Sequence, residues 1–165
     1  MMRSILILAL IPPLVTFAAL DAGQFRINAS ESLPIGLYRV SPTGAFVEFC
    51  PDDHGLSAQR HYRPRGGCAD GAAPLLKPLV AGPGNEIVLN SAGISVNGKL
   101  LRNTAPLGRD TEGRPLPHSP YGSYTTPAGM QWVASTYNSR SYDSRYFGPI
   151  RESAVRARLQ PVIAW

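Results

Sequence analysis

Three short runs of the sequence hold residue types that can carry nucleophilic chemistry, and the first is residues 28–38. Ser32 lies there two residues before Pro34 and four before Gly36. Proline and glycine make this backbone stiff and tightly turned, so that it can present a hydroxyl and its own N–H to a substrate. If the segment is extended, Ser30 lies on the same side and is a candidate donor to an oxyanion. An ordinary Ser/Pro turn between two strands is the alternative.

The second run places a lysine among apolar residues. Lys77 lies within Pro-Leu-Leu-Lys-Pro-Leu-Val, residues 74–80. One interpretation is a lysine on the solvent side of a half-buried strand, or one whose side chain reaches out of it. The other is a desolvated lysine whose lowered pKa leaves a neutral amine near neutral pH, which can take a proton from a serine hydroxyl. Lys99, beside an Asn-Gly turn, is interpreted as a solvated residue.

The third run, residues 138–149, is dense in polar side chains and flanked by aromatic residues. Ser141, Asp143 and Arg145 alternate in it. In a strand they share one face, with the carboxylate between a hydroxyl and a guanidinium. A surface loop with a local ion pair is the alternative.

Histidine is the usual base for a catalytic serine, but this sequence gives little basis for that arrangement. His54, His61 and His118 all lie in polar stretches rich in proline and glycine. No acidic partner can be placed beside any of them from sequence, so a Ser–His–Asp triad remains an unsupported alternative.

The N-terminus predicts export. Arg3 is followed by an uncharged apolar run from Ile5 to Leu20, which is the pattern of a signal peptide or signal anchor. The positive-inside rule places Arg3 in the cytoplasm and everything after Asp21 across the membrane. We therefore expect residues 1–22 to be the membrane segment or leader, and 23–165 to be one periplasmic domain. The alternative of a buried core helix is disfavoured by Pro12 and Pro13.

An exported chain favours a disulfide between its two cysteines. Cys50 and Cys68 are the only ones, and an even pair outside the cytoplasm usually bridges. We expect the bridge to close a polar surface insertion at residues 51–73. A metal site with His54 and His61 is the alternative, although the Cys-x3-His-x6-His-x6-Cys spacing matches no common zinc pattern.

Composition predicts a mainly β domain. The chain holds 16 Gly and 16 Pro among 165 residues, which suits short strands and turns rather than long helices. The expected strands are residues 24–29, 36–40, 45–49, 74–80, 86–89, 94–101, 130–135 and 154–164, with residues 103–129 irregular or loosely stranded. The net charge of +5 comes from scattered arginines with no basic run, which argues against nucleic-acid binding.

Taken together and in this order, the three runs resemble the signal peptidase family that uses a Ser–Lys dyad. The run with Ser32 resembles the serine box of the family, KPLVAGPG at 77–84 its lysine box, and SYDSRYFG at 141–148 its Ser-x-Asp-Ser-Arg box. The match covers roughly residues 26–49, 74–101 and 130–165. The form S-x-P-x-G-L-Y at 32–38, GRPLP at 113–117 and the cysteine-bounded insertion resemble the conjugative-transfer, or TraF, branch. Leu33 replaces the usual Met, and Asn85 stands where the family often has Asp.

This resemblance implies an antiparallel β-fold with a catalytic groove that faces the membrane and accepts an extended peptide. It implies that Ser32 is the nucleophile and Lys77 the base, and that Ser30 and the Ser32 N–H hold the oxyanion. Asp143 and Arg145 would support the lysine side of the site together with Ser141, and Asp143 takes a more direct part in pilin-cyclising members. No cofactor or metal is implied.

The expected substrate is a pilin precursor or another exported protein at the inner membrane, which the enzyme would cleave or cyclise. A general signal peptidase that removes leader peptides is one alternative. A non-catalytic periplasmic assembly factor of a conjugation apparatus is another, and the presence of Ser32, Lys77 and Asp143 argues against it. A basic DNA-handling protein of the transfer system is a third, and the predicted export argues against it.

Overall fold

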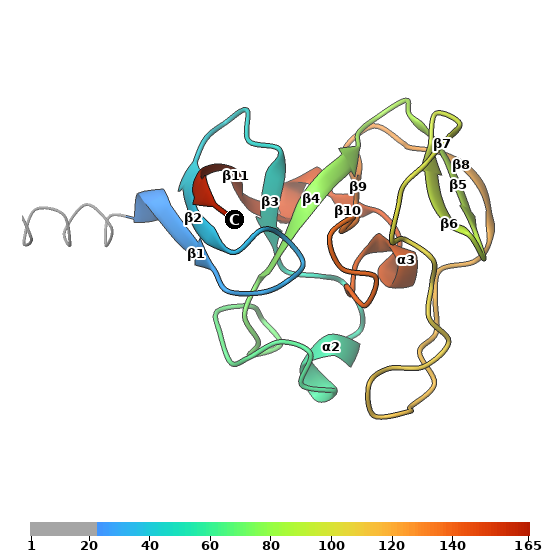
Figure 1. The fold of residues 1–165 in the computed structure, drawn as a ribbon, viewed down its shortest axis with the longest axis horizontal. Helices are drawn as coiled ribbons and strands as arrows, with labels where there is room; N and C mark the ends of the chain where they lie inside the picture. Colours follow the sequence, from blue (N-terminus) through green and yellow to red (C-terminus); the bar gives the residue numbers. More distant parts are fainter. Residues whose placement is uncertain (1–22) are drawn as a thin grey trace, which may run out of the picture.

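Two antiparallel β-sheets form the framework of residues 23–165, the part of the chain described by the computed structural model (Figure 1). The larger sheet has the strand order β1-β2-β11-β3-β4-β9-β10, and the smaller has the order β7-β6-β5-β8. The elements are β1 (Phe25–Asn28), β2 (Gly36–Val40), β3 (Phe46–Phe49), α2 (Leu56–Gln59), β4 (Leu75–Ala81), β5 (Glu86–Asn90), β6 (Gly93–Val96), β7 (Lys99–Leu100), β8 (Gly122–Thr125), β9 (Met130–Val133), α3 (Ser144–Phe147), β10 (Ile150–Arg151), η2 (Glu152–Ala154) and β11 (Val155–Ala164). The mainly β, antiparallel fold class predicted from the sequence is confirmed.

Local sequence explains the smaller sheet directly. In β5, Ile87 and Leu89 are fully buried, Val88 between them is half-buried and the polar ends of the strand are exposed, because alternate residues of a strand point to the same face. The turn between β6 and β7 has positive φ at both Asn97 and Gly98, 48° and 80°. These are the two residue types that a tight hairpin turn of this kind favours, so the meander predicted over 86–101 is confirmed.

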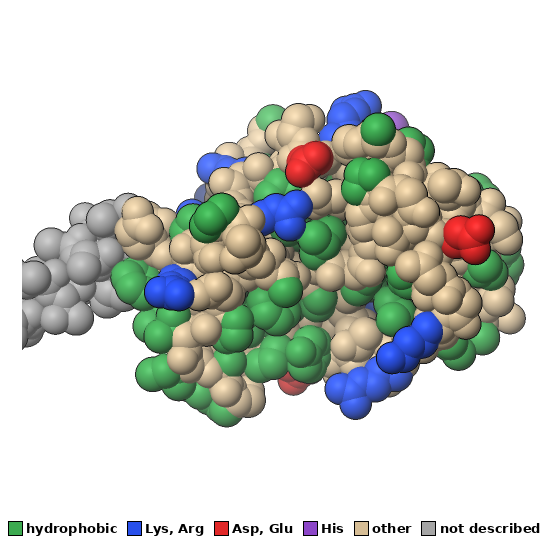
Figure 2. Space-filling model, turned by 90° about the horizontal axis from the view of Figure 1, so that it is seen from above, with side chains coloured by type: hydrophobic (Ala, Val, Ile, Leu, Met, Phe, Trp, Pro, Cys, Tyr) green, Lys and Arg blue, Asp and Glu red, His purple; other side chains and the backbone are tan. Residues whose placement is uncertain are grey.

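Apolar side chains remain exposed at the end of the molecule where the described chain begins. Ile27 in β1 and Ile163 in β11 are 80% and 62% exposed, and both are in register with Leu37 of β2 between them. Trp165, which follows β11, is 78% exposed. Figure 2 shows apolar side chains gathered on this end of the visible face. The end of the larger sheet near β1 therefore presents apolar surface to its surroundings.

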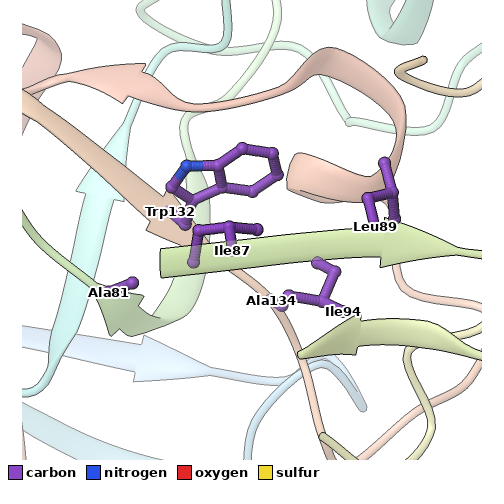
Figure 3. Packing of buried hydrophobic residues seen from close by; sticks show 6 residues of the cluster. All are labelled: Ala81, Ile87, Leu89, Ile94, Trp132 and Ala134. Carbon is purple, nitrogen blue, oxygen red and sulfur yellow. The ribbon is translucent and has the colours of Figure 1, made fainter. Parts of the chain in front are cut away.

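The two sheets are joined by a core that β9 completes. Trp132 from β9 packs with Ala81 of β4, Ile87 of β5 and Ile94 of β6 (Figure 3). Trp132 is 1% exposed and the two isoleucines are fully buried. Because one large side chain contacts residues of both sheets, β4 is held by packing against the smaller sheet as well as by its neighbours in the larger sheet.

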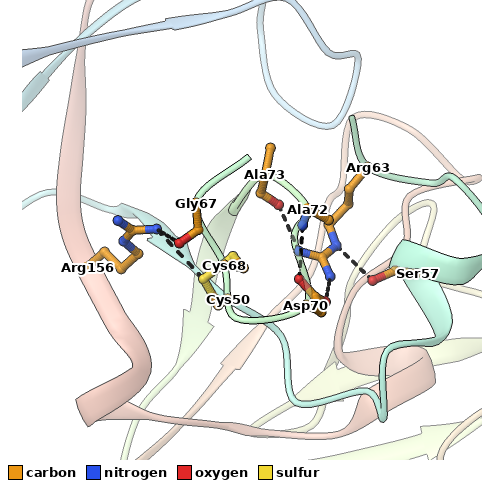
Figure 4. The surroundings of a disulfide bond; sticks show 9 residues. All are labelled: Cys50, Ser57, Arg63, Gly67, Cys68, Asp70, Ala72, Ala73 and Arg156. Atoms are coloured by element: carbon orange, nitrogen blue, oxygen red, sulfur yellow. Dashed lines mark hydrogen bonds and ion pairs between the residues drawn. A yellow bond between two sulfur atoms is a disulfide. The ribbon is translucent and has the colours of Figure 1, made fainter. Parts of the chain in front are cut away.

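The predicted disulfide is confirmed and closes most of the insertion (Figure 4). Cys50 and Cys68 are bonded, with their Cα atoms 5.7 Å apart. Both sulfurs are used in this bond, so the alternative zinc site with His54 and His61 is wrong. The insertion is more ordered than a surface loop, because Arg63 is buried, donates to Ser57 Oγ and the Ala73 carbonyl, and pairs with Asp70.

One prediction for secondary structure is wrong. Ser141, Asp143 and Arg145 do not share the face of a strand, because the chain makes one helical turn, α3, at Ser144–Phe147. The Asp143 carboxylate accepts from the Arg145 N–H and caps that turn. Aspartate favours this capping position, and the local hydrogen bond competes successfully with strand formation. Sequence alternation alone gave no sign of that competition.

The predicted membrane segment, residues 1–22, lies outside the described residues, and so does the boundary placed after it. Within residues 23–165, no helix has both the length and the apolar character needed to cross a membrane.

Removal of the disulfide is expected to cost stability but not the arrangement of the strands. The bond closes a loop with a sequence separation of 18, for which restriction of the unfolded chain contributes about 3 kcal/mol. Cys50→Ser with Cys68→Ser should lower the free energy of unfolding by about that amount in urea titrations. The reduced parent should match the double variant. A double variant as stable as the oxidised parent would contradict this prediction.

Candidate active site

The structure brings one residue from each of the three sequence runs into direct contact. Lys77 Nζ lies 2.6 Å from Ser32 Oγ and 2.8 Å from Ser141 Oγ, and the two hydroxyls are 3.3 Å apart. These residues are separated by 45 and 64 positions in sequence. A primary amine within hydrogen-bond distance of a serine hydroxyl is the geometry of a nucleophile with its base.

Strand β4 positions the lysine, and packing on both of its sides buries it. Lys77 pairs with Val47 of β3, while Leu79 pairs with Val133 of β9. The lysine is only 4% exposed although no salt bridge to it exists within residues 23–165. Of the two interpretations of its sequence, the structure therefore supports the desolvated lysine and contradicts the solvent-facing one.

Burial changes the protonation of this lysine. Desolvation lowers the pKa of Lys77 from 10.5 to about 8, because the charged ammonium is disfavoured away from water. The negative charge of Asp143 opposes this and raises the pKa, while the positive charge of Arg145 lowers it further. The net result is an amine that is neutral in an appreciable fraction of molecules near pH 8.

The turn that carries Ser32 is held in shape by Asn28 at the end of β1. The Asn28 side-chain amide donates to the carbonyl oxygens of Ser30, Leu33 and Pro34, at 2.8, 3.3 and 3.0 Å. Its Oδ1 accepts from the Ser30 N–H and hydroxyl. One buried side chain thus makes five hydrogen bonds to residues 30–34. The sequence analysis missed this role of Asn28. The available signal was that asparagine tolerates the αL conformation and often forms turns through its side chain.

Packing anchors the same turn from the other side. Leu33, next to Ser32, is 1% exposed and packs with Tyr38 and Leu159 in the core of the larger sheet. The Tyr38 hydroxyl also donates to the Pro34 carbonyl at 2.7 Å. Leu33, which stands where the family resemblance predicts methionine, therefore anchors the turn that carries Ser32 in the core.

Ser30 does not occupy the extended segment that the sequence analysis assumed. Residues 30–33 form a turn, and Ser30 is exposed while Ser32 is 9% exposed. The Ser30 hydroxyl donates to Asn28 Oδ1 at 2.8 Å. It lines the same cavity as Ser32, so a role toward an oxyanion requires its hydroxyl to exchange this partner for the substrate. That role remains a prediction.

Asp143 and Arg145 form a fully buried ion pair behind the lysine. The guanidinium donates to both carboxylate oxygens, at 2.9 and 2.8 Å, and both side chains are 0% exposed. Arg145 also donates to the carbonyls of Asn103, Ala105, Ser139 and Ser141. Because the bond to the Ser141 carbonyl fixes the loop there, the ion pair positions the hydroxyl that contacts Lys77.

A cavity of about 650 Å³ opens beside these groups. Ser30, Ser32, Lys77 and Ser141 line it, and so do Tyr62 and Arg63 from the insertion and Leu107 to Leu116 in part. The insertion and the 103–120 loop meet at Asp110, whose carboxylate accepts from the Tyr62 hydroxyl at 2.6 Å and from Arg114. Sequence reasoning treated the insertion as a surface element and missed that it forms a wall of the site.

The three histidines lie elsewhere, since none of them lines this cavity. His118 stacks on Tyr121 and contacts the Ser119 carbonyl. Residues 23–165 contain no group of three or more His, Cys, Asp or Glu side chains arranged to hold a metal ion.

Part of the edge of β4 is free at the cavity. Leu79 N donates to the Ala45 carbonyl, and Ala134 N donates to the Pro78 carbonyl, so alternate residues of β4 bond to opposite sides. Pairing with β9 begins only at Leu79. By this alternation the backbone N–H and carbonyl of Leu76 face the cavity, one residue before the lysine.

We predict a stability signature for the buried lysine that requires no substrate. In the window from about pH 8 to pH 10.5 the unfolded chain binds more protons at residue 77 than the folded protein does. The contribution of Lys77 to the stability of the parent should therefore rise with pH across that window, and comparison with a variant that lacks this lysine isolates it from the other titrating groups. At pH 7, Lys77→Met should have a higher free energy of unfolding than the parent. In urea titrations this difference should shrink by about 3 kcal/mol between pH 7 and pH 10.5.

Lys99→Met, at an exposed position in β7, is the matched control for loss of one lysine. A Lys77→Met difference that does not change with pH would show that the lysine is not desolvated.

Comparison with known proteins identifies the family of this chain. The family model described as signal peptidase, peptidase S26, matches residues 1–165. A plasmid transfer protein TraF from Escherichia coli is 36% identical over 151 residues, which cover 87% of this chain and 85% of that protein. The conjugal transfer protein TraF of Agrobacterium tumefaciens (strain 15955) is 32% identical over 157 residues, covering 90% and 87%.

A structural similarity is weaker. A signal peptidase I from Enterococcus faecalis V583 aligns with a TM-score of 0.40 and 17% identity, covering 73% of this chain and 97% of that one. The family match over the whole sequence and the TraF relatives show that this chain belongs to the S26 signal peptidase family.

Proposed function

We propose that this protein is a serine endopeptidase in which Ser32 is the nucleophile and Lys77 the general base. The observation that carries the proposal is the 2.6 Å contact between Lys77 Nζ and Ser32 Oγ, made by a lysine that is 4% exposed. Burial lowers the pKa of this amine to about 8, so that the form able to accept a proton exists near neutral pH.

The reaction proceeds in two halves. Ser32 Oγ attacks the substrate carbonyl carbon while neutral Lys77 takes the hydroxyl proton, and the carbonyl oxygen becomes an oxyanion. The tetrahedral intermediate then expels the amine, which receives the proton from Lys77, and an ester to Ser32 remains. In the second half, water or a substrate amine attacks the ester while neutral Lys77 takes a proton from the attacking group, and Lys77 then gives that proton to Ser32 Oγ as the ester bond breaks. The products are a new carboxylate or a new amide, respectively.

The groups around the dyad have distinct parts in this mechanism. Ser141 Oγ, at 2.8 Å from Lys77 Nζ, orients the amine toward Ser32. The Ser32 N–H donates no hydrogen bond within residues 23–165, and it would stabilise the oxyanion with the Ser30 hydroxyl. The buried Asp143–Arg145 pair holds Ser141 and sets the field at the lysine.

The substrate would bind as an extended strand that is cleaved at the membrane surface. The free backbone groups of Leu76 offer β-pairing to a peptide beside the dyad. The exposed apolar residues Ile27, Ile163 and Trp165 suit the face of an anchored enzyme that lies against a lipid surface. We propose a periplasmic location, with residues 1–22 as anchor or leader, on the basis of the uncharged apolar run that follows Arg3.

We propose a pilin precursor of a conjugation system as the substrate class. Support comes from the relatives described as plasmid or conjugal transfer proteins. The proposed acyl-enzyme can be attacked by water, which would trim the precursor, or by the N-terminal amine of the substrate itself, which would close a circle. Both outcomes use the same Ser32 ester, so the second nucleophile decides between them.

The dyad is tested with two substitutions and intact-mass spectrometry of the candidate pilin from the same cells. Ser32→Ala should remove all product, because no ester can form. Lys77→Arg should do so as well, because arginine keeps the charge but does not act as a base near pH 7. With the parent, loss of a terminal peptide shows processing, and a further loss of one water shows cyclisation.

Lys99→Arg, at an exposed lysine, is the matched control and should process normally. Product formation by a folded Lys77→Arg variant would remove the lysine from the mechanism.

The role of Ser30 is tested separately. As an oxyanion donor, its loss in Ser30→Ala should slow turnover by about 10²–10³-fold without abolishing it. Ser30→Thr should restore part of the rate because a hydroxyl remains. If Ser30 only completes the turn through Asn28, the Ala variant should match the parent within about twofold.

A further inference from the structure

Ser135, which follows β9, makes direct contact with the backbone of the nucleophile. Its hydroxyl donates to the Ser32 carbonyl at 2.7 Å, across 103 residues of sequence. The residue is 0% exposed. Ser32 is thus bonded at its side chain by Lys77 and Ser141, and at its main chain by Ser135.

The hydroxyl of Ser135 is itself held in one orientation. Its oxygen accepts from the N–H groups of Tyr137 and Asn138, at 3.1 and 3.2 Å. A serine hydroxyl has one donor and two acceptor sites, so all of its hydrogen-bonding capacity is used. The single proton can only point at the Ser32 carbonyl while these two bonds exist.

The backbone of Ser135 connects this contact to the buried ion pair. Its N–H donates to Asp143 Oδ2 at 3.0 Å, on the carboxylate that Arg145 also binds. The Asp143 carboxylate therefore acts on the site in two ways. Its charge acts on Lys77, and its hydrogen bond fixes the residue that holds the main chain of Ser32.

We propose that Ser135 is a positioning residue that fixes the main chain of Ser32, and so the placement of its Oγ against Lys77. The proposal rests on the proposed function of Ser32 as nucleophile. A displacement of the nucleophile by even about 1 Å is enough to cost on the order of 10²-fold in rate. Neither the serine box nor the lysine box contains this residue.

The role predicts a specific kinetic signature. Ser135→Ala removes the bond to the Ser32 carbonyl but keeps the backbone N–H to Asp143. The rate should therefore fall while the pH midpoint set by Lys77 stays in place. Asp143→Asn removes a charge that raises the pKa of Lys77, so its midpoint should move to lower pH.

The test uses acetylation of Ser32 by p-nitrophenyl acetate, followed by peptide mass spectrometry across pH 6 to 10. The Ser32 oxygen bonds to the acetyl carbon, p-nitrophenolate leaves, and Lys77 takes the proton. In Ser135→Ala we expect acetylation of Ser32 to slow by about 10- to 100-fold with an unchanged midpoint. Ser135→Thr should recover much of the rate, because the donating hydroxyl remains.

Thr104 provides a matched control. It is 1% exposed and its hydroxyl donates to the Leu101 carbonyl at 2.7 Å, but it lies in contact with β6 rather than Ser32. Thr104→Val should lose stability without changing Ser32 acetylation by more than about twofold. All variants are compared well below their melting temperatures, after circular dichroism confirms the fold.

Two results would overturn the proposal for Ser135: a Ser135→Ala rate within twofold of the parent, or an equal fall in Thr104→Val. Rapid acetylation of Ser32 without cleavage of any peptide or pilin would instead overturn the proposed function alone. Acetylation of Ser32 in the parent no faster than that of the exposed Ser91 would overturn both.

Discussion

The burial of one lysine side chain beside two serine hydroxyls is the constraint on which the site depends. An ammonium group 4% exposed and without a salt bridge in residues 23–165 is costly, and desolvation lowers its pKa to about 8. That cost is also the source of the proposed chemistry, because only a neutral amine accepts a proton from Ser32. The Asp143 carboxylate limits the shift, since it favours the charged form. The pKa of Lys77 is thus set by burial, which lowers it, and by the charges of the buried Asp143–Arg145 pair.

The loop from Ser135 to Arg145 positions the groups around the buried lysine. Its first residue holds the Ser32 carbonyl, Ser141 contacts Lys77, and Asp143 with Arg145 binds the loop to itself. Buried polar networks are stable only when their members are satisfied, and each of these groups has its partners. The consequence is that Ser32, in the turn before β2, and Lys77, in β4, are placed by a third segment that contains neither of them.

The remaining walls of the site come from segments with little regular structure. The disulfide-closed insertion contributes Tyr62, and the loop after β7 contributes Asp110, which accepts a hydrogen bond from it. The S26 family membership rests on the sequence match, and the TraF relatives share most of their length with this chain. The cavity between these walls and β4 therefore combines Ser32 and Lys77 with loops joined by their own polar contacts.

The sequence by itself determined the mainly β class, the strands β1 to β6 to within a few residues, the disulfide, and Ser32 and Lys77 as the candidate pair. These depend on local alternation, turn residues, cysteine count and recognisable runs. Tertiary structure decided whether Lys77 was buried, because a lysine in an apolar strand fits either face until its neighbours are known. It also decided that Asp143 caps a helical turn, that Ser30 bonds to Asn28, and that Ser135 reaches Ser32. A hydrogen bond between residues 103 positions apart produces no periodic pattern in the sequence. It requires only that the fold bring the two loops together.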